Sequence, residues 1–124
     1  MNVLGLDHIV LNVADVERSL AWYMGTVGLV GERVDLWRHG RAPFPSVRVD
    51  AGTIIDLVLA NSTGSNMDHL CLVVTRDDVD AIVTDDRFTV VDGPGPRFGA
   101  RGDGWSVYVK DPDDNTVEFR SYDA

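Results

Sequence analysis

The feature that most constrains this sequence is a segment that occurs twice. Residues 6–13, Leu-Asp-His-Ile-Val-Leu-Asn-Val, correspond to residues 67–74, Met-Asp-His-Leu-Cys-Leu-Val-Val. Each copy is an Asp-His pair at the start of an apolar run. Because side chains alternate between the faces of a strand, each copy predicts a strand with one wholly apolar face and one face that carries the histidine. The apolar face needs a core to pack on, so we expect His8 and His69 to face a cavity.

The repeat continues beyond these two strands. Residues 46–49, Ser-Val-Arg-Val, recur as residues 106–109, Ser-Val-Tyr-Val, and each copy is followed by a turn and an apolar strand with one acidic residue. The acidic residue is Asp56 in the first copy and Glu118 in the second. The spacing from histidine to carboxylate is 48 residues in the first copy and 49 in the second. The chain therefore predicts two copies of one module.

The order of expected elements is the same in both modules, residues 1–62 and residues 63–124. Each reads as strand, helix and then three strands, which gives an α+β fold of two tandem βαβββ modules. We expect them to pair about a pseudo-two-fold axis into a cup-shaped mixed sheet with the helices outside, as one domain over residues 1–124. The expected segments include a helix that Asp15 caps, a strand at 29–37, a polar linker at 61–66, a long Gly/Pro loop at 93–104 and a turn at 111–115.

Composition narrows the classes of partner. The net charge of −9 argues against nucleic acid or an anionic membrane surface as a partner. No stretch approaches the ~18 apolar residues of a membrane span, and the N-terminal residues do not resemble a signal peptide. Cys71 is the single cysteine, which we interpret as a small buried residue rather than a nucleophile. A reducing cytoplasm is the location that this cysteine usage favours.

The two histidines and two carboxylates form a candidate metal site. Neutral imidazole and carboxylate are ligands that suit zinc, iron, manganese, nickel or cobalt. Strands hold such ligands more rigidly than loops do. A single histidine on a strand is more often structural than a ligand, but four such residues at matched spacing favour a metal. The candidate ligands are His8, Asp56, His69 and Glu118.

Several of these motifs resemble the vicinal oxygen chelate superfamily, which includes glyoxalase I, methylmalonyl-CoA epimerase, fosfomycin- and bleomycin-resistance proteins and extradiol dioxygenases. The resemblance covers essentially the whole chain. It is carried by residues 6–15, by Trp22-Tyr23 before Gly28-Leu29, by Asp68-His69-Leu70, and by Asp-Pro-Asp-Asp-Asn-Thr-Val-Glu at 111–118. The last stretch resembles the family's Asp-Pro-Asp-Gly-Asn hairpin, with Asp114 where glycine is usual.

The resemblance implies a site and a chemistry. His8, His69 and Glu118 stand at the positions of the family's metal ligands. Asp56 stands where members with four ligands carry Glu or Gln, and it is one methylene shorter than Glu. With Asp56 the site is similar to a lyase or isomerase centre, and without it the other three residues form a 2-His-1-carboxylate triad like that of iron oxygenases. The family's shared mechanism implies a small molecule with vicinal oxygens as substrate, with Asp56 or Glu118 as proton acceptor.

Five further residues are candidates for substrate binding. Arg48 and Tyr108 occupy matching positions in the repeated strands. Trp105 follows the Gly/Pro loop, on which Arg97 and Arg101 could bind an anionic substrate. Two exposed arginines are more often only solvated. His39 lies in an expected loop and is a weaker candidate for a catalytic acid.

Three functional hypotheses remain open at this level. The first is a glyoxalase-like lyase or isomerase that depends on a divalent metal. The second is an iron-dependent extradiol-type dioxygenase, and the third is a metal-free drug-binding protein like those of bleomycin resistance. The resemblance also implies a homodimer, with the modules paired within one chain or exchanged between two.

Overall fold

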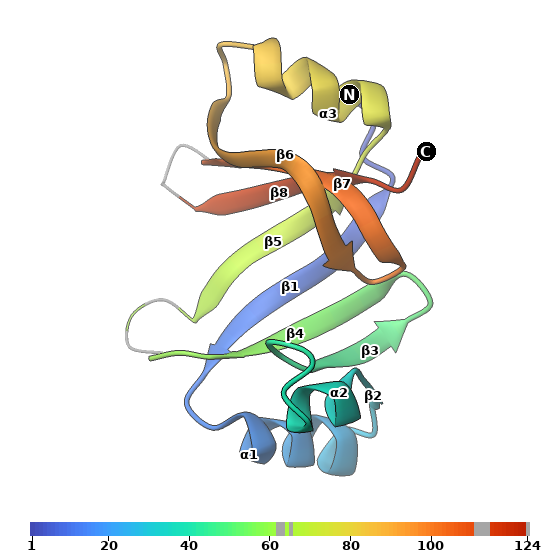
Figure 1. The fold of residues 1–124 in the computed structure, drawn as a ribbon, viewed down its shortest axis with the longest axis vertical. Helices are drawn as coiled ribbons and strands as arrows, with labels where there is room; N and C mark the ends of the chain where they lie inside the picture. The colour runs from blue at the N-terminus through green and yellow to red at the C-terminus, as the bar shows by residue number, and fades with distance from the viewer. Residues whose placement is uncertain (62–63, 65, 111–114, 124) are drawn as a thin grey trace. The chain divides into compact units, whose positions relative to one another are not determined.

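The computed structural model describes residues 1–61, 64, 66–110 and 115–123. These residues group into two compact units, and the boundary between them passes through the first strand. The first unit consists of residues 1–8 and 69–124, and the second consists of residues 9–68. The described elements mix strands with a few short helices (Figure 1). This arrangement confirms the predicted α+β class with a mixed sheet.

The second unit combines short antiparallel strands with short helices. Its strand order is β2-β3-β4-β1, and the β2–β3 and β3–β4 pairs are antiparallel. The elements are β1 (Gly5–Val13), α1 (Val16–Leu20), the π-helix η1 (Ala21–Thr26), β2 (Val30–Glu32), α2 (Val34–Arg38), β3 (Ser46–Asp50) and β4 (Thr53–Leu59).

The helix α1 begins where the sequence predicts it. The Asp15 side chain accepts a 3.0 Å hydrogen bond from the backbone N–H of Arg18, which satisfies one of the N–H groups left unpaired at a helix start. Val16 and Leu20, four residues apart, then lie on one face of the helix. They pack with Val47 and Leu57 in the core of the second unit.

The first unit contains a longer helix over a mixed set of strands. Its strand order is β1-β5-β8-β7-β6, with β5 parallel to β8 and the β7 pairs antiparallel. Its further elements are β5 (Met67–Val73), α3 (Arg76–Thr84), β6 (Thr89–Gly99), β7 (Gly102–Lys110) and β8 (Thr116–Ser121). Thr75 and Asp78 form a capping box at the start of α3, and Val79 and Ile82 pack on Val107 and Phe119.

The predicted strand at 29–37 is wrong over most of its length. Only Val30–Glu32 forms a strand, because Arg33 adopts a left-handed backbone (φ 60°) that ends the extended chain. Val34–Arg38 is a short helix, and Val34 and Trp37 pack against the core of the second unit. Five residues are too few to show a helical period, so the alternation of apolar residues suggested a strand.

The predicted loop at 93–104 is also wrong, because these residues belong to a β-hairpin. β6 and β7 pair from Thr89↔Lys110 to Gly99↔Gly102, with register shifts between Val90 and Gly95. Proline is tolerated in β6 because this strand stands at the end of the strand order, where one row of backbone groups needs no partner strand. The glycines and prolines therefore mark an irregular edge strand rather than a loop.

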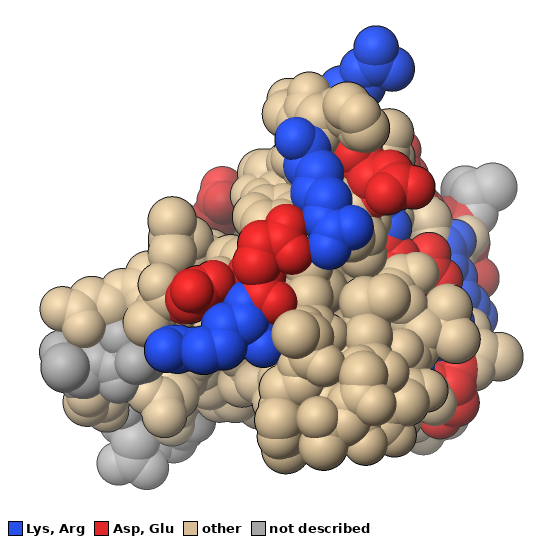
Figure 2. Space-filling model, turned by 90° about the horizontal axis from the view of Figure 1, so that it is seen from below, with Lys and Arg blue, Asp and Glu red and all other residues tan. Residues whose placement is uncertain are grey.

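Two predicted segments lie partly outside the described residues, namely most of the linker at 61–66 and residues 111–114 of the turn. Among the residues that are described, no helix has the length and apolar character needed to cross a membrane. On the face in Figure 2, Lys and Arg side chains lie directly beside Asp and Glu side chains. Among the described residues of the second unit, Arg38 pairs with Glu17 and Arg48 pairs with Glu32.

Candidate metal centre

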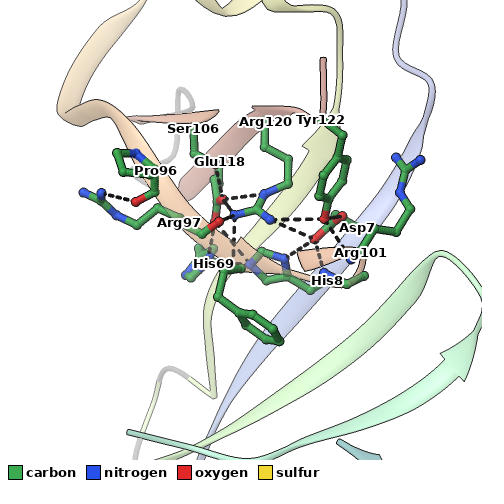
Figure 3. Close-up of polar contacts among 12 residues, drawn as sticks. Asp7, His8, His69, Pro96, Arg97, Arg101, Ser106, Glu118, Arg120 and Tyr122 are labelled. Atoms are coloured by element: carbon green, nitrogen blue, oxygen red, sulfur yellow. Dashed lines mark hydrogen bonds and ion pairs between the residues drawn. The ribbon is translucent and has the colours of Figure 1, made fainter. Parts of the chain in front are cut away.

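The structure brings three of the predicted ligands together within the first unit. His8 comes from β1, His69 from β5 and Glu118 from β8 (Figure 3). The parallel pairing of β5 with β8 places Cys71 opposite Glu118, so His69 lies one alternation away on the same face as this pair. Strand pairing therefore fixes two of the three side chains at adjacent positions.

The three side chains present one atom each to a common point. Nε2 of His8 lies 3.1 Å from Nε2 of His69. Oε1 of Glu118 lies 3.2 Å from the first nitrogen and 3.0 Å from the second. His8 and Glu118 are buried, whereas the His69 side chain keeps 12% of its surface exposed. A small molecule can thus reach the cluster from the side on which His69 lies.

These distances fit a metal ion. Metal–ligand distances of about 2.1 Å place two ligand atoms about 3.0 Å apart at a right angle and about 3.4 Å apart at a tetrahedral angle. The observed separations of 3.0, 3.1 and 3.2 Å are closer to the right-angle value. Two imidazoles and one carboxylate on one face of an octahedron form the facial triad, with the remaining positions open.

The hydrogen bonds of His8 support the same assignment. Nδ1 of His8 lies 2.7 Å from Oδ2 of Asp7, which identifies Nδ1 as the protonated nitrogen and leaves a lone pair on Nε2. That lone pair faces Oε1 of Glu118, a buried oxygen on which no described residue directs a hydrogen-bond donor. Electron-rich atoms held this close in a buried place make a suitable site for a cation.

The second oxygen of Glu118 is held by hydrogen bonds from two other side chains. Oε2 accepts a 2.8 Å hydrogen bond from Oγ of Ser106 and a 3.2 Å hydrogen bond from Nε of Arg120. Burial raises the pKa of Glu118, but the nearby His69 and His8 rings and the Arg120 guanidinium lower it more, so this pKa lies well below its usual range. Glu118 is therefore an ionised carboxylate with Oε1 available as a ligand atom.

Arg120 is a fully buried cation with partners on every side. Besides Glu118, its guanidinium donates to the backbone carbonyls of Arg97 (2.9 Å), Phe98 (3.0 Å) and Gly102 (3.4 Å). Burial lowers the pKa of Arg120, but the Glu118 carboxylate, the hydrogen bond to Tyr122 and other nearby groups together raise it by more, so this pKa lies above its usual value. A buried arginine is stable in this place because charge and hydrogen bonds are both matched.

Asp7 has a comparable set of partners. Its carboxylate accepts hydrogen bonds from His8, from the backbone N–H of Ala100 (3.0 Å) and from the hydroxyl of Tyr122. Burial raises the pKa of Asp7, yet these hydrogen bonds outweigh it and lower the pKa below the ordinary value. The matching residue in the second copy of the repeat, Asp68, is exposed. Asp7 is thus the member of the repeated Asp-His pair that orients a histidine.

The other predicted site residues have varied surroundings. Asp56 is buried in the second unit, where Oγ of Ser46 donates a hydrogen bond to it. Tyr108 places its ring edge-on to His69, with the centroids 5.4 Å apart. Trp105 packs on the apolar cluster beneath α3, with the Arg76 guanidinium 4.4 Å above its ring.

The three candidate arginines are all partly or fully exposed. Arg97 contacts the carboxylate of Asp92 at 3.2 Å and lies 5.8 Å from the ring of Tyr108. Arg101 stacks on Tyr122 at 4.2 Å. Arg48 pairs with Glu32 in the second unit, and the exposed His39 contacts a backbone carbonyl of α2. Of these, Arg97 has the most direct connection to the metal centre, through Tyr108 and His69.

Sequence reasoning missed Ser106, Arg120 and Tyr122, and it did not give Asp7 a role. Part of the signal was present in β8 and the residue after it, because Glu118, Arg120 and Tyr122 alternate along the chain. A charged residue two positions from a predicted ligand is a reasonable candidate for its partner. The carbonyl groups that Arg120 binds could not be predicted, because they follow from the hairpin register.

Comparison with known proteins identifies the family. The sequence model of the Glyoxalase/Bleomycin resistance protein/Dioxygenase superfamily matches residues 5–119. The chain belongs to this superfamily. The match confirms the resemblance noted from the sequence, and it covers the candidate ligand residues His8, His69 and Glu118.

Individual relatives agree with this assignment. The chain is 30% identical over 130 residues to the glyoxalase domain-containing protein RDO1 of Mycosarcoma maydis, covering 98% of this chain and 70% of the relative. It is 24% identical over 131 residues to the virulence protein STM3117 of Salmonella typhimurium, covering 94% and 83%. The Mn(II)-bound glyoxalase of Novosphingobium aromaticivorans has the same fold, with a TM-score of 0.69 at 20% identity, over 96% of this chain and 39% of that chain.

Proposed function

We propose that this protein is a glyoxalase-like lyase or isomerase that depends on a divalent metal and acts on a small molecule with two neighbouring oxygens. The observation that carries the proposal is the set of three ligand atoms, from His8, His69 and Glu118, at mutual distances of 3.0 to 3.2 Å. Superfamily membership and the shared fold of a Mn(II)-bound glyoxalase support it. Zinc, nickel, manganese, cobalt and iron are the metals that this ligand set accepts.

The residues around the site have different roles in this proposal. His8, His69 and Glu118 would hold the metal ion, which would supply Lewis-acid stabilisation of negative charge on the substrate oxygens. Asp7 holds His8 in the tautomer with a lone pair on Nε2. Arg120 and Ser106 keep Glu118 ionised and fix its orientation. Tyr108, edge-on to the most exposed ligand, is the nearest candidate for contact with the substrate.

The proton acceptor is assigned separately. The low pKa of Glu118 suits a metal ligand and makes this carboxylate a weak base. Of the two predicted proton acceptors, we therefore propose Asp56 for this role. An Asp56→Ala variant should keep its metal and lose turnover, whereas a Glu118→Ala variant should lose both. Loss of metal in the Asp56→Ala variant would instead identify Asp56 as a fourth ligand.

A second candidate function follows from the same triad. Two histidines and one carboxylate with open positions are the ligand set of non-haem iron oxygenases. An extradiol-type dioxygenase would consume oxygen with a catechol substrate and would require ferrous iron. Oxygen uptake measured with the iron-loaded protein, beside the zinc- and nickel-loaded forms, separates this candidate from a lyase or isomerase.

The deciding experiment is metal analysis by plasma mass spectrometry on the untagged protein. We expect close to one equivalent of a divalent metal in the wild type and its loss in His8→Ala, His69→Ala and Glu118→Ala. His39→Ala is the matched control, because this histidine lies outside the triad, and it should retain the metal. A wild-type protein that takes up none of the five metals would overturn the enzyme proposal and leave a metal-free binding protein.

A further inference from the structure

The tip of the β6–β7 hairpin, residues 97–102, is tied to the buried residues behind the metal centre. Two of its backbone N–H groups point inward. The N–H of Ala100 donates to Oδ2 of Asp7 at 3.0 Å, and the N–H of Arg101 donates to the hydroxyl of Tyr122 at 3.1 Å. The tip is therefore held by side chains from β1 and from the end of β8 as well as by its own strand pairing.

The backbone carbonyls of the same segment are bound by Arg120. Its Nη2 donates to the carbonyls of Arg97 and Phe98, and its Nη1 donates to that of Gly102. Three carbonyls and two N–H groups of the hairpin tip thus end on three side chains, Asp7, Arg120 and Tyr122. Buried ionised side chains are costly unless they are hydrogen-bonded, and the backbone groups of the tip are such partners for Asp7 and Arg120.

These three side chains also reach the metal ligands. Asp7 contacts Nδ1 of His8, and Arg120 contacts Oε2 of Glu118. Tyr122 connects the two branches, since its hydroxyl donates to Asp7 and accepts from Nη1 of Arg120 at 3.1 Å. The hairpin tip is thus connected to His8 through Asp7 and to Glu118 through Arg120 (Figure 3).

The packing leaves little room for this network to relax. A Cβ on Gly99 would lie 1.7 Å from Nη1 of Arg120 and 2.6 Å from Oδ2 of Asp7. The Arg120 guanidinium is held by its hydrogen-bond acceptors, so moving it aside would cost free energy. The hairpin tip, Arg120 and Asp7 therefore adopt their positions together or not at all.

We propose that Asp7, Arg120 and Tyr122 are positioning residues that couple the hairpin tip to the metal ligands, so that metal binding and ordering of the tip are thermodynamically linked. The inference rests on the proposed metal site. A bound metal ion would hold His8 and Glu118 in place. These two residues would in turn hold Asp7 and Arg120, so the hydrogen bonds from Asp7 and Arg120 to the backbone of the tip would be more ordered. Linkage is reciprocal, so the factor by which metal binding favours the ordered tip equals the factor by which ordering of the tip favours metal binding, and a change that uncouples the two weakens metal binding.

The test measures zinc affinity and amide hydrogen exchange on the same protein. In the wild type, zinc should slow exchange of the Ala100 and Arg101 amides. Tyr122→Phe removes one hydroxyl and keeps the ring. It should weaken zinc binding about 10-fold, in the range for residues behind a metal ligand, and it should reduce the zinc-dependent protection of Ala100, whose own acceptor is Asp7.

A second variant and a control make the result decisive. Asp7→Asn keeps the shape of the side chain, and its reporter is the Arg101 amide, whose acceptor is Tyr122. It should lose zinc affinity and reduce zinc-dependent protection at that amide. Tyr23→Phe, a tyrosine of the second unit, should change neither quantity. A purely structural role for Tyr122 and Asp7 would lower thermal stability in the variants without changing zinc affinity or the exchange response.

The outcomes separate this inference from the proposed function. Zinc binding by the wild type with no change in exchange at Ala100 and Arg101 would overturn the coupling alone. Unchanged zinc affinity in both Tyr122→Phe and Asp7→Asn would also overturn it. A wild-type protein that binds no zinc, nickel, manganese, cobalt or ferrous iron would overturn the coupling and the proposed metal site together.

Discussion

Ser106 and Glu118 lie on neighbouring strands, and the serine hydroxyl donates a 2.8 Å hydrogen bond to Oε2 of the carboxylate. Oε1 of the same carboxylate faces the His8 and His69 rings at 3.2 and 3.0 Å. One oxygen of Glu118 is thus used for orientation and the other for ligation. The two roles can be separated by mutation.

We predict that Ser106→Ala weakens metal binding without abolishing it. The variant leaves Glu118 ionised by Arg120 but removes one of the two groups that orient it. A buried hydrogen bond of this kind contributes about 1–3 kcal/mol, and we expect the zinc dissociation constant to rise about 10-fold. Competition with a chromophoric chelator measures it. Equal zinc affinity in Ser106→Ala and wild type would contradict the prediction.

Metal removal should lower thermal stability. A ligand that binds only the folded state at 100 times its dissociation constant stabilises that state by about 2.7 kcal/mol. For a domain of this size the melting temperature should rise on the order of 10 °C with zinc. Differential scanning calorimetry with zinc and with a chelator checks this. His69→Ala, which removes the most exposed ligand, should melt at the same temperature in both conditions.

Replacement of Arg120 should be the most destabilising single change at the site. Arg120→Met leaves the carboxylates of Glu118 and Asp7 buried near each other without their shared cation. Breaking a buried ion pair by removing one partner costs about 3–5 kcal/mol. Arg120→Lys keeps the charge but cannot reach several acceptors at once, so we expect an intermediate loss. Urea unfolding gives both values, and a loss below about 1 kcal/mol for Arg120→Met would show that the network contributes little to stability.

Gly99→Ala should destabilise the first unit although it adds only one methyl group. The new Cβ would overlap the Arg120 guanidinium, and overpacking of a well-packed site costs about 1–3 kcal/mol. Gly5→Ala is the matched control, because a Cβ there meets nothing within 4 Å. Equal urea midpoints for the two variants would argue against this close packing of Gly99 on Arg120.

Cys71 should be unreactive in the native protein. The residue is 0% exposed in β5, and burial is the main reason that the pKa of its thiol is raised. Thiol reagents act on the thiolate, so reaction should occur only after unfolding. The rate of labelling by a disulfide reagent, with and without denaturant, checks this. Rapid labelling of the native protein would mean that β5 opens easily.

The parts of the fold that were predictable are those with a strong local pattern. The alternation in residues 6–13 and 67–74 was enough to predict β1 and β5 and the faces of His8 and His69. α2 and β6 could not be predicted in the same way. The first depends on one residue with a left-handed backbone, and the second is a strand whose glycines and prolines read locally as a loop.

The same distinction between local patterns and distant partners applies to the candidate site. The duplicated spacing was enough to propose His8, Asp56, His69 and Glu118 as ligands, and the structure brings three of them, His8, His69 and Glu118, together. The groups that support them were missed because their partners are distant in the sequence. Asp7 meets Ala100 and Arg120 meets Phe98 only because of the hairpin register. Asp56, Trp105 and the exposed arginines stay predictions from the sequence, as do the homodimer and the cytoplasmic location.

The contact between Gly99 and Arg120 limits which substitutions this chain can accept during evolution. A side chain at position 99 is excluded while the Arg120 guanidinium and the Asp7 carboxylate occupy the space next to it. Substitutions here are therefore contingent on order, since Arg120 and Asp7 must both give way before position 99 gains bulk. A lineage that took this step would keep the two histidines and the glutamate but would no longer retain its hairpin glycine by selection.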